Sequence, residues 1–301
     1  MMAFGEPMDV AIERLGTNTM SEAENIAEKA TEARNPFQML HETVAPEAIS
    51  DELRPTIEEF GLEDNCRQLA TEGWTVVEEV ASPEFNERLR NKILELRPGG
   101  NMLLAKDPVF SEAVLSPKLL AMAEFSVGRG FLISQVAASV RPQGSPSIGL
   151  HADANWLPAP FPAHNMLLTG CWACDEYTKE GGSTLVIPGS NVLHRHPDPD
   201  EVAAKEGAIA IECPPCSVAM WDGNLWHANW PRETEGERVV AHITYTRLMM
   251  RQIEDYGAVA DDLIEQHGER MAQLLGREDS LDSPTGFRFD KIAKTFNNAK
   301  L

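Results

Sequence analysis

The sequence of 301 residues contains no run of about 18 consecutive apolar residues, the length that a membrane-spanning helix needs. Its first residues lack the basic start and apolar run of a secretory signal, so the expected location is the cytoplasm. Basic residues are also few, since 26 lysines and arginines stand against 47 acidic residues, a formal net charge of −21. No basic cluster offsets that charge, so we expect neither nucleic acid nor a membrane surface as a partner.

Cysteine is scarce, with five residues, four of which form the pairs Cys171–Cys174 and Cys213–Cys216. Two such pairs can form a tetrahedral zinc site. The segment around Cys171 resembles a strand, however, and residues three apart on a strand face opposite sides. We therefore interpret the pairs as small buried thiols. The odd number of cysteines argues against a disulfide framework.

The order of sequence patterns predicts a mainly β domain with flanking helices. Residues 1–65 are acid-rich with helical spacing, which predicts a helical N-terminal extension, and residues 251–301 predict a C-terminal helical segment. Residues 66–250 form the predicted central domain, with helices expected at 82–98 and 116–128. Short β-type runs follow, separated by Pro, Gly and Asp, a pattern typical of an antiparallel sandwich or barrel. These runs are 131–140, 165–174, 182–189, 208–215, 217–223 and 238–247.

The motif "GLHAD" indicates a metal site. His151 and Asp153 are two residues apart, so on extended backbone both side chains leave the same face. The third ligand that the sequence suggests is His227, which lies between tryptophans after a hydrophobic strand and a turn. Two histidines and one carboxylate occupy one face of an octahedral ion, as in non-haem Fe(II) oxygenases, although zinc binds the same set. His194 and His196 lie in a charged, proline-rich segment that is more typical of a solvated loop.

Arg238 is the candidate for binding an anion near this site. The segment between His227 and Arg238 contains Pro231 and Gly236 amid charges, which predicts a hairpin loop that returns the chain to the metal. From Arg238 onward the strand alternates, so His242 shares its face, and an arginine on such a face can bind a carboxylate through two hydrogen bonds. An exposed or ion-paired arginine is the alternative. The two faces comprise Arg238, His242, Thr244 and Thr246 on one side and Val239, Ala241, Ile243 and Tyr245 on the other.

The span from about 131 to 250 resembles the phytanoyl-CoA dioxygenase-like (PhyH) family of Fe(II)/2-oxoglutarate oxygenases. The matching segments are "GLHAD", "CWACDEYTKEGGSTLVIPGSNVLH" and "SVAMWDGNLWHANWPRETEGERVVAHITY". The resemblance implies a double-stranded β-helix, a jelly-roll or cupin-like core. It implies Fe(II) on His151, Asp153 and His227 as catalytic residues, with Arg238 on the distal carboxylate of the cosubstrate 2-oxoglutarate.

The resemblance also implies secondary cosubstrate contacts and shows two departures from the family pattern. Gln135 stands where family members often place a polar contact, and Trp172 is expected beside the cosubstrate or, alternatively, in the core. Val240 replaces a serine or threonine common in the family, so Thr244 is the expected substitute for that hydrogen bond. Asn229 replaces a serine common after the distal histidine. Neither departure removes a metal ligand.

The function that the resemblance implies is oxidation of a small molecule, with O2 consumed and succinate and CO2 released. Hydroxylation is the leading reaction because Asp153 fills the position that related halogenases leave open for chloride; desaturation and ring formation remain alternatives. Two other classes also remain open, a cupin-like zinc hydrolase or isomerase and a non-catalytic ligand-binding member of the fold.

The segment 154–165 follows the metal motif and predicts the type of substrate. It contains Trp156, Phe161, Asn165 and four prolines, so it either covers an apolar substrate or is an ordinary connection. No cluster of lysine and arginine is present to bind the phosphates of an acyl-CoA. We therefore expect a small, largely apolar metabolite. No sequence signal indicates an oligomeric state.

Overall fold

The computed structural model describes residues 45, 47–97, 100–277, 279 and 281–282. The chain divides into two units, Met1–Glu42 and Thr43–Leu301, and every described residue belongs to the second. The predicted helical extension lies outside the described residues over positions 1–44. Within the described part of the chain, no helix combines the length and apolar character needed to cross a bilayer.

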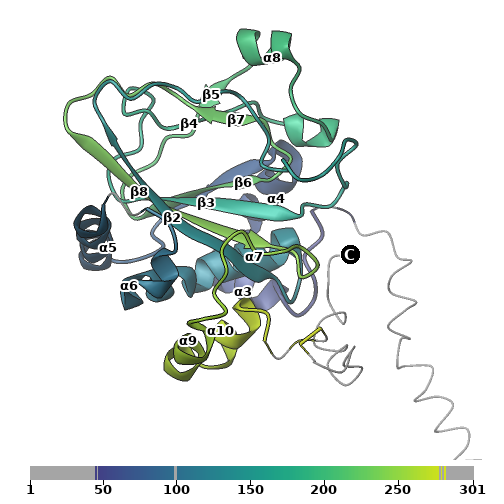
Figure 1. The fold of residues 1–301 in the computed structure, drawn as a ribbon. Coiled ribbons are helices and arrows are strands. Elements are labelled where there is room, and N and C mark those ends of the chain that lie inside the picture. The colour runs from purple at the N-terminus through teal and green to yellow at the C-terminus, as the bar shows by residue number, and fades with distance from the viewer. Residues whose placement is uncertain (1–44, 46, 98–99, 278, 280, 283–301) are drawn as a thin grey trace, which may run out of the picture. The chain divides into compact units, whose positions relative to one another are not determined.

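Two antiparallel sheets form the centre of the described unit (Figure 1). The larger sheet has the strand order β1-β6-β3-β8-β2, and the smaller has the order β5-β4-β7. In the larger sheet no two neighbouring strands are consecutive in the sequence, so this sheet combines early and late segments of the domain. The strands are β1 (Trp74–Val77), β2 (Leu132–Pro142), β3 (Leu167–Ala173), β4 (Thr184–Val186), β5 (Ile209–Ala210), β6 (Ser217–Asp222), β7 (His227–Asn229) and β8 (Glu237–Thr246).

Most helices cover the face of the larger sheet that points away from the smaller sheet, whereas α8 lies on the side of the smaller sheet (Figure 1). The helices are α3 (Arg54–Phe60), α4 (Glu63–Glu72), α5 (Pro83–Leu96), η1 (Leu103–Ala105), α6 (Pro108–Val114), α7 (Pro117–Val127), η2 (Ser190–Leu193), α8 (Pro199–Ala204), α9 (Ala260–His267) and α10 (Glu269–Leu274). This arrangement leaves the space between the two sheets for a site.

Local sequence sets the starts of two helices through side-chain caps. Ser82 Oγ accepts a hydrogen bond of 3.2 Å from the backbone N–H of Phe85 at the start of α5. Asp107 Oδ1 does the same for Val109, at 3.0 Å, at the start of α6. The sequence patterns predict α5 and α7, whereas α6 was not predicted, although an aspartate before a proline is the same kind of helix-start signal.

Strand β8 separates the hydrophobic core from the space between the sheets. The apolar residues of its predicted face are all buried against the helices, whereas Arg238, His242 and Thr244 line a cavity on the opposite side. The alternation predicted from the sequence therefore matches the structure: one face of β8 packs in the core, and the other faces the cavity. The core residues of β8 are Val239, Ala241, Ile243 and Tyr245.

The six predicted strand segments correspond to β2, β3, β4, β5, β6 and β8. The predicted helical segment after residue 250 contains α9 and α10. The predicted boundary between residues 65 and 66 falls inside α4, which spans Glu63–Glu72. The division into an extension, a central domain and a C-terminal segment stays a prediction.

Candidate functional site

His151, Asp153 and His227 form the group of metal-binding side chains that the described residues bring together. Their ligating atoms all lie within 4.8 Å of one another. Asp153 Oδ1 lies 3.4 Å from His227 Nε2 and 3.7 Å from His151 Nε2. The two histidines meet because their backbones exchange hydrogen bonds of 3.0 and 2.8 Å, although 76 positions separate them in the sequence. The site thus joins the segment before the proline-rich loop to strand β7.

Hydrogen bonds orient all three side chains toward one point. The Nδ1–H of His151 donates to the Gly149 carbonyl at 2.8 Å, and that of His227 donates to the Leu225 carbonyl at 3.0 Å. Each Nε2 is thereby left as the lone-pair nitrogen that a metal requires. This donor set of two imidazoles and a carboxylate fits a divalent iron or zinc ion.

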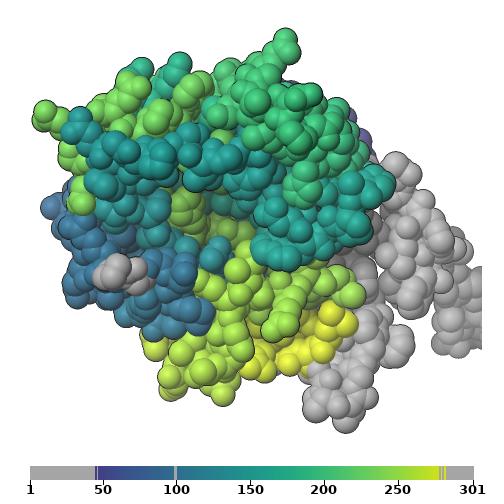
Figure 2. All heavy atoms as spheres, turned by 45° about the horizontal axis from the view of Figure 1, so that its top comes forward, coloured from purple at the N-terminus to yellow at the C-terminus, as the bar shows by residue number. Residues whose placement is uncertain are grey.

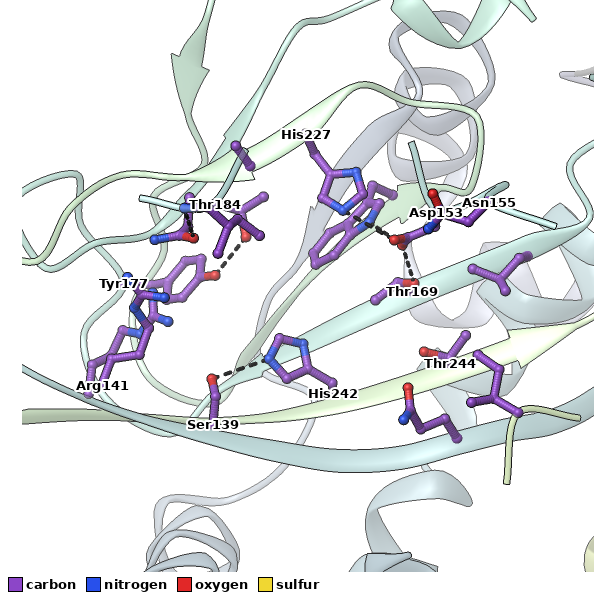
Figure 3. A pocket seen from close by; sticks show the side chains of 18 of the residues that line it. Ser139, Arg141, Asp153, Asn155, Thr169, Tyr177, Thr184, His227, His242 and Thr244 are labelled. Carbon is purple, nitrogen blue, oxygen red and sulfur yellow. Dashed lines mark hydrogen bonds and ion pairs between the residues drawn. The ribbon is translucent and has the colours of Figure 1, made fainter. Parts of the chain in front are cut away.

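Asp153 is held by two further side chains that the sequence analysis did not identify. Its Oδ2 accepts hydrogen bonds from Thr169 Oγ1 at 3.0 Å and from Trp221 Nε1 at 3.1 Å (Figure 3). Oδ1 remains directed at the two imidazoles. Thr169 and Trp221 lie opposite each other on β3 and β6, so the pairing of the larger sheet positions the carboxylate. The sequence offered one signal for Thr169, which is a polar residue on the cavity-facing side of a predicted strand.

Protonation of the triad follows from its burial and its mutual contacts. Burial by itself raises the pKa of Asp153, but His227, His151 and the Trp221 hydrogen bond together outweigh burial and hold this pKa below its ordinary value. Burial and the neighbouring His227 lower the pKa of His151. Burial acts to lower the pKa of His227, yet Asp153 reverses the direction and raises it. An ionised carboxylate between two imidazoles suits a cation.

A cavity of about 370 Å³ extends from this triad between the sheets. Figure 2 shows the molecular surface hollowed between teal residues near 140–160 and the yellow-green segment that includes β8 and the residues after it. The predicted residues Gln135, Trp156, Arg238 and Thr244 line the cavity together with Asp153 and His227. The other lining residues are Ser139, Arg141, Ile148, Asn155, Leu167, Thr169, Tyr177, Thr184, Trp221, Ala228, Asn229, His242 and Ile253.

Arg238 occupies the cavity as a buried cation, with only 3% of its surface exposed. Its Nη1 donates to the Gly182 carbonyl, and its guanidinium lies 4.8 Å from the centre of the Tyr177 ring. Its Nε is buried without a hydrogen-bond partner. Tyr177 is fixed by a hydrogen bond of 2.7 Å to Thr184 Oγ1. An unsatisfied, buried guanidinium donor in a cavity is suited to a carboxylate ligand.

His242 lies between the triad and the arginine end of the cavity (Figure 3). Burial, reinforced by the charge of Arg238, lowers the pKa of His242 to about 4. Its Nε2 lies 3.3 Å from Ser139 Oγ. A neutral imidazole provides a hydrogen-bonding wall without adding a charge. Gln135 and Thr244 are register partners on β2 and β8 and line the same wall.

Three exposed apolar side chains line the cavity near the surface. Ile148, Trp156 and Ile253 are 48%, 64% and 41% exposed, respectively. Ile253 is held in place because the next residue, Glu254, is buried and accepts hydrogen bonds from the backbone N–H groups of Met102 and Val136. These three side chains give the outer part of the cavity an apolar rim.

The structure does not bring three other predicted contact residues into this cavity. Trp172 is fully buried in the core on the helical side of the larger sheet. Phe161 is 3% exposed and packs edge-on against His196, with ring centres 4.9 Å apart. Asn165 is buried, and its side chain caps the backbone N–H groups of Leu167 and Gly223. Trp172 faces the core because strand alternation places Cys171, not Trp172, on the cavity side.

Replacement of Trp172 with phenylalanine is expected to lower stability and leave 2-oxoglutarate affinity unchanged. The change removes a 3.0 Å hydrogen bond from Trp172 Nε1 to Asn86 Oδ1 and leaves packing space beside Phe85. We expect the free energy of unfolding to fall by about 1–3 kcal/mol. Urea denaturation and calorimetric titration of the variant check this expectation. A clear loss of 2-oxoglutarate affinity in the folded variant would return Trp172 to the cosubstrate site.

The alternative metal-binding groups named from the sequence lie elsewhere. His194 lines a second cavity of about 200 Å³, away from the triad, and His196 packs on Phe161. Cys171 and Cys174 belong to different hydrophobic clusters on opposite faces of β3, as alternation predicts. All five cysteines are free thiols.

Fold and site together define a double-stranded β-helix protein with a two-histidine, one-carboxylate triad at one end of its internal cavity. The family model for phytanoyl-CoA dioxygenase (PhyH) matches residues 64–240. The chain therefore belongs to the PhyH family, and the predicted family is confirmed. The cofactor and cosubstrate of this family are Fe(II) and 2-oxoglutarate, and the residues present fit both.

Curated relatives match over about half of this chain. Dioxygenase af480 of Aspergillus fumigatus is 30% identical over 173 residues, which cover 56% of this chain and 55% of the relative. Protein Rv1501 of Mycobacterium tuberculosis is 25% identical over 184 residues, which cover 58% of this chain and 65% of the relative. The chain thus spans less than two thirds of the length of these relatives.

Solved structures of HygX from Streptomyces hygroscopicus share the fold. The structure with nickel and 2-oxoglutarate bound is 17% identical, covers 68% of this chain and 90% of HygX, and has a TM-score of 0.53. The structure that also holds hygromycin B covers 63% of this chain and 88% of HygX at 16% identity, with a TM-score of 0.54. This likeness confirms the predicted double-stranded β-helix core.

Proposed function

We propose that this protein is an Fe(II)/2-oxoglutarate-dependent oxygenase that hydroxylates a small, largely apolar molecule. One observation carries the proposal: a single cavity reaches Asp153 and His227 of the His-Asp-His triad at one end and, at the other, the buried guanidinium of Arg238, whose Nε has no hydrogen-bond partner. A 2-oxo dicarboxylic acid has a chelating group and a distal carboxylate, which match these two ends. Membership of the PhyH family supports the same activity.

The side chains divide the work as follows. His151, Asp153 and His227 would hold Fe(II), and Arg238 would hold the distal carboxylate of 2-oxoglutarate. When bound, Fe(II) supplies O2 activation, with 2-oxoglutarate as the source of two electrons. The overall balance is substrate, O2 and 2-oxoglutarate giving hydroxylated substrate, succinate and CO2. Thr169 and Trp221 keep the Asp153 carboxylate in position throughout because both donate to its second oxygen.

The cavity entrance supports an apolar substrate. Ile148, Trp156 and Ile253 provide exposed apolar surface there, and Asp153 is the only acidic residue among those that line the cavity in the described part of the chain. An apolar molecule packed against these side chains excludes water from the metal end. Asn155 and Asn229 also line the cavity and offer hydrogen bonds to an isolated polar group on the substrate.

Anaerobic titration with Fe(II) tests the proposed function. We expect a weak visible charge-transfer band when Fe(II) and 2-oxoglutarate are both present, and no band with either alone. Zn(II) in place of Fe(II) is the matched control because it fits the same ligands but has a filled d shell. Tight zinc binding with no band and no 2-oxoglutarate binding would contradict the proposal and favour the zinc hydrolase or isomerase.

A further inference from the structure

Arg141 is a second cation in the cavity, in addition to Arg238. It lies on β2 directly opposite Arg238 on β8, since their Cα atoms are register partners. Directly opposite residues of an antiparallel pair project from the same face. Both arginines line the cavity, and Figure 3 shows Arg141 beside Tyr177, at the end away from His227 and Asp153.

The two arginines form a like-charged pair without a protein counter-ion. None of the ion pairs among the described residues includes Arg141 or Arg238. Burial, and then the charge of Arg238, lower the pKa of Arg141. Like charges directly opposite each other destabilise a sheet. In a chain with a net charge of −21, the lack of an acidic ion-pair partner for either arginine among the described residues favours an external anion in that role.

Each guanidinium also retains an unused donor. Arg238 donates through Nη1 to the Gly182 carbonyl, and Arg141 donates through Nη2 to the Pro146 carbonyl. These bonds fix the direction of both side chains. The Nε of each arginine is buried and has no hydrogen-bond partner. A guanidinium has five N–H groups, so each arginine keeps further donors for one shared ligand beside its carbonyl bond.

We propose that Arg141 is a second cosubstrate-binding residue, which clamps the distal carboxylate of 2-oxoglutarate together with Arg238. The inference rests on the proposed function. A carboxylate has two oxygens and about four acceptor positions, so it can accept hydrogen bonds from both guanidinium groups at once. Its negative charge also converts the repulsion between the arginines into attraction to a shared anion. The clamp selects a 2-oxo dicarboxylic acid over a 2-oxo monocarboxylic acid.

The test compares two cosubstrates and three arginine variants by anaerobic calorimetric titration of the Fe(II)-loaded protein. The cosubstrates are 2-oxoglutarate and 2-oxopentanoate, which has the same carbon chain without the distal carboxylate. We expect Arg141→Gln to weaken 2-oxoglutarate binding about tenfold, because Arg141 is partly exposed and its charge is partly screened. Its affinity for 2-oxopentanoate should match that of the wild type. Arg238→Gln should lose more 2-oxoglutarate affinity than Arg141→Gln. Arg251 is exposed, and Arg251→Gln, which makes the same charge change, should keep the wild-type affinity.

Thermal unfolding separates this role from a structural one. Without cosubstrate, Arg141→Gln should melt no lower than the wild type, because the change removes a repulsion. The rise in melting temperature that 2-oxoglutarate causes should shrink in the variant, since stabilisation follows affinity. Arg141→Lys should recover part of the lost affinity, because it keeps the charge but not the planar group.

Three results decide between the possibilities. Unchanged 2-oxoglutarate affinity in Arg141→Gln overturns the clamp and leaves the proposed function in place. An equal loss of affinity for both cosubstrates in Arg141→Gln, together with a lower melting temperature, also overturns the clamp. Arg141 would then hold the loop at Pro146. A wild-type protein that binds neither cosubstrate overturns the proposed function itself.

Discussion

His151→Ala, Asp153→Ala and His227→Ala are each expected to abolish stoichiometric Fe(II) binding and turnover. The three ligating atoms lie within 4.8 Å of one another, so each substitution removes one of the three ligands that the protein offers to the ion. Asp153→Ala should have the largest effect on stability as well, because it leaves the donors of Thr169 and Trp221 without their acceptor. Anaerobic calorimetry with Fe(II) and circular dichroism of the metal-free variants measure the two effects.

His196→Ala is the matched control for the triad. It removes an imidazole that packs on Phe161 and belongs to no metal-binding group in the described residues. We expect its Fe(II) affinity to equal that of the wild type. If the three triad variants keep full activity while His196→Ala and His194→Ala lose it, the metal lies at the histidine pair that the sequence offered as the alternative.

Arg238→Ala is expected to weaken 2-oxoglutarate binding by about 2–5 kcal/mol, or roughly thirty- to several-thousand-fold. The guanidinium is almost fully buried, so its pairing with a carboxylate is shielded from water. Fe(II) affinity should change little because Arg238 is at the other end of the cavity. Arg238→Lys should recover only part of the loss, since lysine keeps the charge without the planar donor pair. Calorimetric titration under anaerobic conditions measures the 2-oxoglutarate affinities of the wild type, Arg238→Ala and Arg238→Lys.

The structure decides which arginine is a suitable control for Arg238. Arg247 is nine residues further along the chain, which suggests an exposed position on the other face. In the structure it is largely enclosed, and its Nε donates to the Asn165 carbonyl at 2.9 Å. Arg251 is exposed, and its replacement by alanine should be silent. Equal 2-oxoglutarate affinities in Arg238→Ala and Arg251→Ala would refute the assignment of Arg238.

Features with a local physical cause were predictable from the sequence. Strand alternation alone places His151 and Asp153 on one face, and the same period assigns Arg238, His242 and Thr244 to the cavity side of β8. Pro231 and Gly236 correctly predicted a loop between His227 and Arg238. The predicted hairpin was wrong, because β7 and β8 do not pair and the loop connects the smaller sheet to the larger one. Helix α5 begins at Ser82 because a serine before a proline is a local cap signal. Each of these predictions needed only neighbouring residues.

Features that depend on pairing between distant segments were decided by the tertiary structure. Trp172 was expected beside the cosubstrate or in the core, and only the packing of β3 against the helices places it in the core. Phe161 and Asn165 follow Asp153 closely in sequence, but the loop turns both away from the cavity. Ile148 and Ile253 meet at the entrance from segments about a hundred residues apart.

The sequence by itself therefore predicted the fold class and the candidate metal ligands through its resemblance to the family, and it predicted the arginine that faces the cavity through the alternation of one strand. The strand register decided the rest. Only the pairing of β2 with β8 brings Arg141 opposite Arg238, and only the pairing of β3 with β6 directs Thr169 and Trp221 at Asp153. Such contacts arise from the burial of whole sheet faces, which is a property of the assembled domain and of no single segment.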